Sequence, residues 1–92
     1  MAVIDNREAR RYEMTIDGQL AFADYRASGD VIRITHVEVP RALEGRGHGS
    51  RFMKAILAEI RVHKQKVIPL CSFAAAYIHR HPEEQDLLAS NT

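Results

Sequence analysis

Cysteine is almost absent from this sequence, which contains one in 92 residues. An internal disulfide and a cysteine-rich metal site are therefore excluded, and the fold must be held together by packing alone. No apolar run approaches the ~18 residues of a membrane span, and residues 1–11 contain no apolar stretch typical of a signal peptide. We therefore expect a protein of the reducing cytoplasm with no membrane partner.

A large charge of either sign is also missing. Thirteen Lys and Arg side chains against twelve Asp and Glu give a net charge of +1, which disfavours a protein that binds nucleic acid through a basic surface. Internal repeats and low-complexity tracts are absent, so solenoid, coiled-coil and disordered proteins are disfavoured too. The short chain contains 46% hydrophobic and 27% charged residues. This composition is typical of one small globular domain, which we assign to residues 1–92.

The order of predicted elements indicates a mixed sheet with two helices. In chain order we expect a hairpin over 11–30, a central strand over 31–39, an amphipathic helix over about 47–64, a short strand over 66–70 and a helix over 72–80 with Ser72 as its N-cap. A helix that connects two neighbouring strands implies that those strands are parallel, whereas hairpin strands are antiparallel. The predicted fold class is therefore α/β (α+β), in the order β-β-β-α-β-α. Residues 6–11 and 89–92 are expected to fray.

Three of the five glycines fall in one segment, Gly45-Arg-Gly-His-Gly49, between the central strand and the long helix. Glycine at alternate positions leaves the backbone uncovered, and the first amides of a helix have no partner within it. Because the helix dipole adds positive charge there, such amides bind phosphate well. Arg46, Arg51 and Lys54 would supplement that charge. A simple tight turn is the alternative, and neither the Walker A loop nor the dinucleotide fingerprint fits the spacing.

Residues 37–50 resemble the pyrophosphate loop that binds acetyl-CoA in the GCN5-related N-acetyltransferase (GNAT) superfamily. They contain Val-Glu-Val-Pro from Val37 and Leu-Glu-Gly-Arg-Gly-His-Gly-Ser from Leu43. The family motif, Gln/Arg-x-x-Gly-x-Gly/Ala, falls on Glu44, Gly47 and Gly49. Glu44 departs from the motif because a carboxylate has the wrong charge beside a diphosphate, and we assign it no binding role.

Three more segments, 35–40, 68–73 and 77–82, are similar to the small single-domain, YjdJ-like branch of the superfamily, so the resemblance covers most of residues 12–88. It implies a GNAT-like mixed sheet with acetyl-CoA between two splayed parallel strands. It also implies main-chain hydrogen bonds from Val37 and Val39 to the pantetheine arm, and a loop that holds the diphosphate. The candidate loop residues are Leu43, Gly45, Arg46, Gly47, His48, Gly49 and Ser50.

Two side chains are candidates for catalysis. Cys71 follows the predicted parallel strand and precedes a helix, where open sheets place ligands and where the field of the helix favours a thiolate. A small buried thiol is the alternative. His36 is expected on the face of its strand that carries Ile34, opposite Val37, and its neutral ring can accept a proton. A structural histidine is the alternative there, and the resemblance favours the catalytic interpretation of both residues.

The other candidates have mainly structural interpretations. Phe73, Tyr77 and Ile78 are expected to pack a helix against the sheet, although the Tyr77 hydroxyl could act as a general acid, as tyrosine does in many GNAT members. His63 is expected to cap the long helix. His79 and His81 do not share a helix face, so no metal site is predicted.

The sequence therefore predicts an acetyl-CoA-dependent N-acetyltransferase that acts on an unidentified amine, either a small molecule or a protein. We expect no nucleic-acid partner and a monomer or weak dimer. The alternative is a non-catalytic module that binds acyl-CoA or a partner protein, because so short a chain leaves little room for an acceptor pocket.

Overall fold

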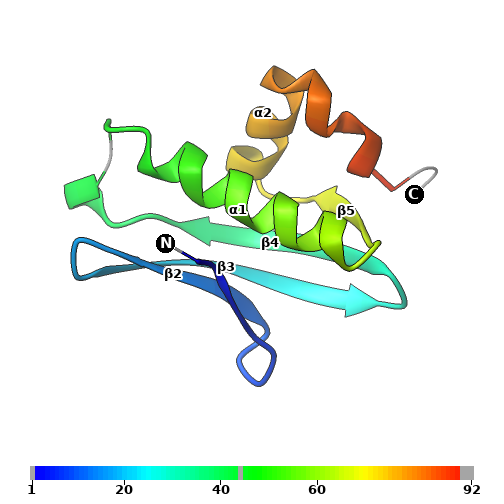
Figure 1. The fold of residues 1–92 in the computed structure, drawn as a ribbon, viewed down its shortest axis with the longest axis horizontal. Helices are drawn as coiled ribbons and strands as arrows, with labels where there is room; N and C mark the ends of the chain where they lie inside the picture. The colour runs from blue at the N-terminus through cyan, green and yellow to red at the C-terminus, as the bar shows by residue number, and fades with distance from the viewer. Residues whose placement is uncertain (1, 44, 90–92) are drawn as a thin grey trace.

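A five-stranded sheet forms the base of the fold in the computed structural model, which describes residues 2–43 and 45–89. The strands, which lie side by side in this order, are β1 (Ile4–Asn6), β2 (Arg11–Ile16), β3 (Gln19–Ser28), β4 (Val31–Glu38) and β5 (Lys66–Pro69). The helices are α1 (His48–Val62) and α2 (Ser72–Arg80), with short 3-10 turns at Arg41–Leu43 and Pro82–Leu87. Figure 1 shows α1 along one side of the strands, with α2 beside it.

The hydrophobic core lies between one face of the sheet and the two helices. Strand alternation supplies one side of it and the helical period supplies the other. The strand contribution includes Tyr12, Met14, Ile16, Ala21, Ala23, Ile32 and Ile34, and α1 adds Phe52, Met53, Ile56, Leu57 and Ile60. Burying one large apolar side chain contributes about 1.5–3 kcal/mol, so this interface positions α1 firmly over the strands.

The mixed sheet and the order of the predicted elements are confirmed. β1 to β4 are antiparallel neighbours, and β4 pairs with β5 in parallel after the crossover through α1. The strand over 31–39 was expected to be central, and β4 is an interior strand with a neighbour on each side. The middle strand of the five is β3, because β1 adds a strand at the far edge that was not predicted.

The N-terminal segment is ordered, contrary to the expectation that residues 6–11 fray. Asn6 pairs with Arg11 across the turn between β1 and β2. The Asn6 side chain holds this turn, because its Oδ1 accepts a hydrogen bond from the amide of Ala9 at 3.1 Å and its Nδ2 donates to Glu13 at 3.0 Å. A strand of three residues is too short to show an alternating pattern in the sequence, which is why it was missed.

The C-terminal end is also fixed further than expected. The 3-10 turn after α2 is joined to α1 by Arg61, which donates to Asp86 at 2.7 Å and to Glu84 at 3.2 Å. Ala89, expected to fray, donates its amide to Val67 of β5 at 3.0 Å. Within the ranges described, no helix has the length and apolar character needed to cross a membrane.

Candidate functional site

One extra residue in β4 determines which side chains reach the site. Asp24 pairs with His36 and Tyr25 pairs with Ile34, so Thr35 has no cross-strand partner in the described ladder. Such a bulge shifts the alternation of faces by one position. Ile34 is therefore buried while His36 is exposed, and the expectation that the two share a face is wrong.

β4 and β5 separate at the bulge. Their parallel pairing ends at Ile34 and Pro69. The amides of Leu70 and Cys71 then both donate to the Ile34 carbonyl, at 2.9 and 3.2 Å, before the chain turns into α2. After this point β4 pairs only with β3. Its free edge can offer backbone groups to a ligand, which is the splayed arrangement that the resemblance implied.

The glycine loop leads into a helix without a side-chain cap. Gly45 and Gly47 have φ angles of 83° and 77°, a left-handed conformation that favours glycine. A Cβ at either position would meet no described atom within 4 Å, so the backbone there faces open space. Gly47 is the N-cap of α1, and no side chain in the described part of the chain bonds to the first turn. Its amides therefore remain available, with the positive end of the helix dipole behind them.

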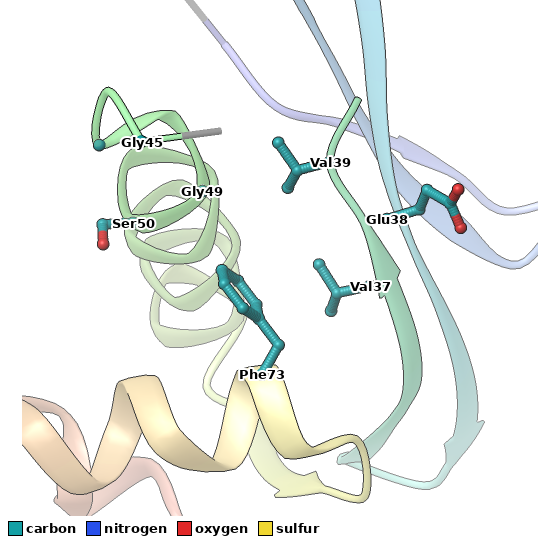
Figure 2. Close-up of a pocket in the computed structure, with 8 residues that line it drawn as sticks. Val37, Glu38, Val39, Gly45, Gly49, Ser50 and Phe73 are labelled. Carbon is teal, nitrogen blue, oxygen red and sulfur yellow. The ribbon is translucent and has the colours of Figure 1, made fainter. Parts of the chain in front are cut away.

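A cleft of about 470 Å³ lies between the end of β4 and the start of α1. In Figure 2, Val37 and Val39 point across it toward α1, whereas the Glu38 side chain points away. The Phe73 ring extends from the first turn of α2 into the space between them. The cleft thus combines an apolar wall with a backbone-lined end that favours anions.

Phe73 is the residue at this site that the sequence analysis missed. Its side chain was assigned to packing, but it is 40% exposed and lines the cleft. A Cβ on Gly49 would lie 2.8 Å from the Phe73 Cζ, so Gly49 permits a close approach between α1 and the ring. The sequence did place Phe73 in the first helical turn after a parallel strand, where open sheets bind ligands, and this position could have indicated its place in the cleft. Tyr77 and Ile78 are buried, as expected.

Most of the candidate cofactor residues line the cleft, namely Val37, Val39, Gly45, Gly47, Gly49 and Ser50. Three others do not. The Leu43 side chain is buried in the core, and Arg46 is exposed on the loop. The Nδ1 atom of His48 lies 3.2 Å from the guanidinium of Arg51. Glu44, to which no binding role was assigned, lies outside the described residues.

His36 stands on the face of the sheet opposite the core. Its Nε2 lies 2.9 Å from Oε1 of Glu38, and its ring centre lies 6.1 Å from that of Phe22. The guanidinium of Arg11 covers the Phe22 ring at 4.7 Å and also donates to Glu13 at 2.6 Å. This hydrogen bond is the main reason why the pKa of Glu13 lies below its usual value. His36 is therefore one member of a polar surface that begins where β4 and β5 separate.

Cys71 lies on the core side of the sheet. It is the N-cap of α2, with Sγ accepting a hydrogen bond from the amide of Ala74 at 3.4 Å, so the expected cap at Ser72 was wrong by one position. The thiol packs partly buried against the core. The structure therefore does not bring His36 and Cys71 into contact. They stand on the two faces of the sheet, on either side of the point where the parallel strands separate.

Tyr77, His81 and His63 have structural partners. Burial raises the pKa of Tyr77, with Glu84 and Glu83 adding to the shift, and its ring stacks on His81 at 3.9 Å. His81 holds the end of α2 by donating from Nδ1 to the Tyr77 carbonyl at 2.7 Å. His63 is the C-cap of α1, as expected. The described residues contain no group of three or more His, Cys, Asp or Glu side chains that could hold a metal ion.

Comparison with known families identifies this arrangement. The model of the GCN5-related N-acetyl-transferase family matches residues 11–87. The chain belongs to this family. The matched range includes β4, the glycine loop, α1 and α2, so the whole cleft lies within the GNAT match.

A solved structure supports the same assignment. The chain is 28% identical to a GCN5-like protein from Staphylococcus aureus, for which an N-acetyltransferase activity is proposed. The two folds superpose with a TM-score of 0.70 over 90% of this chain and 84% of the other. No curated protein matches the chain. The GNAT-like fold is thus established both by the family match and by this structure.

Proposed function

We propose that this GNAT protein is an acetyl-CoA-dependent N-acetyltransferase of the YjdJ-like branch. The observation that supports this most strongly is the cleft, where the unpaired edge of β4 meets the uncapped, glycine-lined start of α1. The open space around Gly45 and Gly47 fits a bulky diphosphate, and the walls at Val37, Val39 and Phe73 fit an apolar pantetheine chain.

The chain's own residues have distinct roles in this proposal. Acetyl-CoA would supply an acetyl thioester, and transfer of the acetyl group to an amine would form a C–N bond, break the C–S bond of the thioester and release the CoA thiol. His36 accepts the proton that the amine loses. Glu38 accepts a hydrogen bond from Nε2 of His36 and so leaves Nδ1 free for the substrate. Cys71 or Tyr77 supplies a proton on the core side, where burial keeps the Tyr77 phenol protonated.

One observation favours a second candidate, a module that binds acyl-CoA without turnover. The described lining of the cleft consists of glycine backbone, valine, serine and phenylalanine, and Glu38, the only titratable residue among these described residues, turns its side chain away. Release of CoA thiol in the presence of a panel of amines separates the two functions. For the enzyme, His36→Ala lowers turnover by about 10²-fold, the usual scale of general-base help, and leaves acetyl-CoA affinity within a few-fold. Binding with no thiol release for any amine would favour the module.

Calorimetric titration with acetyl-CoA tests the cofactor site. The wild type is expected to bind, and Gly47→Glu is expected to abolish binding because it puts a side chain and a negative charge where the diphosphate must lie. Gly18→Glu in the β2–β3 turn is the matched control, since Gly18 has a φ of 75° and equally open surroundings among the described atoms. Both variants carry the same backbone strain. Equal binding by the two would contradict the phosphate-loop assignment.

A further inference from the structure

We propose that the protein has a second binding site, distinct from the acetyl-CoA cleft, for a small molecule that carries a phosphate or carboxylate group on an apolar framework. The site is a cleft of about 550 Å³ that we call the arginine cleft. It is lined by Asp5, Arg7, Arg10, Tyr25, Arg26, Ala27, Ile32 and Gln65. The proposal goes beyond the acetyltransferase function and does not depend on it.

The arginine cleft lies at the opposite end of β4 from the glycine loop. Ile32 stands near the start of this strand and Val37 near its end, and a rise of about 3.3 Å per residue separates them by about 17 Å. Figure 1 shows α1 starting near the end of β4 and running back toward the β3–β4 turn, so the two ends of the helix lie near different clefts. A ligand in the arginine cleft would leave the acetyl-CoA cleft open.

The charge of the arginine cleft is positive and only partly neutralised. Asp5 is its single acidic residue, and both carboxylate oxygens are engaged, one by the Tyr25 hydroxyl at 2.6 Å and the other by Arg7 at 3.4 Å. Among the described residues, Arg10 has no carboxylate within the 4.0 Å of an ion pair. Its guanidinium therefore remains for a ligand, beside that of Arg7, and a guanidinium fork matches the oxygens of a phosphate or carboxylate.

The sheet register shows where the Arg26 side chain lies. Arg26 follows Tyr25 in β3 and is directly opposite Arg33 of β4, so strand alternation puts both arginine side chains on the sheet face opposite Tyr25 and Ile32. Arg7 and Arg10 therefore supply the positive charge beside the floor of the arginine cleft.

The floor of the arginine cleft is apolar and well fixed. Ile32 and Tyr25 are buried in the core, and the Tyr25 ring lies 4.7 Å from that of Tyr12. Burial and the hydrogen bond to Asp5 raise the pKa of Tyr25 to about 12, so at neutral pH its hydroxyl remains a donor that holds Asp5 in place. A rigid apolar floor with charged groups at its edge fits an anion attached to a ring or short chain better than a bare ion.

Amide NMR spectra of the whole protein, titrated with phenyl phosphate and with benzoate at constant ionic strength, test the proposal. The two probes share a ring and differ in the anion, so they distinguish a phosphate from a carboxylate preference. Saturable shifts are expected at Arg10, Arg26 and Gln65, whereas shifts at Gly45–Gly49 would report the acetyl-CoA cleft instead. Failure of acetyl-CoA binding would leave this result unaffected.

Matched variants complete the test. Arg10→Gln should lower the affinity for the better probe by at least about tenfold, the scale of one charged hydrogen-bonding partner. Arg80→Gln, on the exposed face of α2, should leave its affinity unchanged. The proposal is overturned if neither probe gives saturable shifts at the arginine cleft, or if Arg10→Gln and Arg80→Gln weaken binding alike. Amide spectra of each variant confirm that it is folded.

Discussion

The three glycines of the loop are required for two different physical reasons. Gly45 and Gly47 are needed for their left-handed backbone, and their surroundings among the described atoms are open. Gly49 has no such φ angle, but it lies so close to Phe73 that a single added carbon would reach the ring. Two of the glycines therefore shape the loop, while the third allows α2 to contribute a side chain to the cleft.

This difference predicts an unusual result for Gly49→Ala. Alanine favours the helix by up to about 1 kcal/mol, and displacing the end of the Phe73 ring costs a similar amount. Chemical denaturation should therefore show a change of less than about 1 kcal/mol in unfolding free energy. Calorimetry should nevertheless show several-fold weaker acetyl-CoA binding, because the displaced ring lines the cleft.

A double-mutant cycle provides the control for Gly49→Ala. In a Phe73→Ala background the substitution at Gly49 meets no ring, so it should have no further effect on acetyl-CoA affinity. A full additional loss in that background would mean that Gly49 acts on the cofactor directly and not through Phe73.

At the level of elements, the bulge in β4 is what opens the site. Parallel pairing of β4 with β5 stops at Ile34, and Thr35 is the next residue. Because a bulge bends its strand and increases the local twist, β4 turns away from β5 at this point. The extra residue, Thr35, also moves His36 to the outer face, while Val37 and Val39 stay against the core.

Deletion of Thr35 should therefore close the cleft without destroying the fold. The shortened strand keeps Ile34, Val37 and Val39 on one face in regular alternation, so the circular dichroism spectrum should be unchanged. Acetyl-CoA affinity should fall by at least about tenfold, because a strand without the bulge bends less, so Val37 and Val39 no longer lie where they line the cleft.

Substitution of the same residue is the control for the deletion. Thr35→Ala removes only the 3.3 Å hydrogen bond from Oγ1 to the Asp24 carbonyl and keeps the bulge. It should cost about 1 kcal/mol of stability or less and leave acetyl-CoA affinity unchanged. If the deletion variant is folded and binds as tightly as the wild type, the bulge does not open the site.

The sequence predicted most elements because their patterns are local. α1 follows from the helical spacing of its apolar residues, α2 from its start and stop residues, and the hairpin of β2 and β3 from alternation around Asp17-Gly18. The bulge was also visible in principle, since the apolar positions change phase between Ile34 and Val37. Strict alternation was assumed instead, and His36 was placed on the wrong face.

The site was harder to predict because it depends on contacts between distant segments. The glycine loop could be recognised from its own residues, and most of its candidates line the cleft. The position of Phe73 could not be derived from spacing, because it depends on how α2 meets α1. The arginine cleft likewise joins the β1–β2 turn to the start of β4 and to Gln65, and these segments are adjacent only in the folded chain.

At the scale of the whole molecule, the sheet separates the two candidate catalytic residues. His36 lies on its outer face beside Glu38, and Cys71 lies on the core side at the start of α2. An amine approaching from the outer face would meet His36 first. A cysteine nucleophile needs a base within hydrogen-bond reach, and the described contact of the Cys71 Sγ is with the Ala74 amide, which is a donor.

This separation predicts direct transfer of the acetyl group from acetyl-CoA to the amine. Incubation with acetyl-CoA in the absence of amine should therefore give no stable acetyl adduct on Cys71, as judged by intact-mass spectrometry with hydroxylamine treatment to remove any thioester. Cys71→Ala should then lower turnover without changing the kinetic pattern, because a proton donor is lost but no covalent intermediate. A stoichiometric adduct that disappears in Cys71→Ala and passes its acetyl group to added amine would instead establish Cys71 as the nucleophile. It would also require another base on the core side of the sheet, since His36 faces the opposite way.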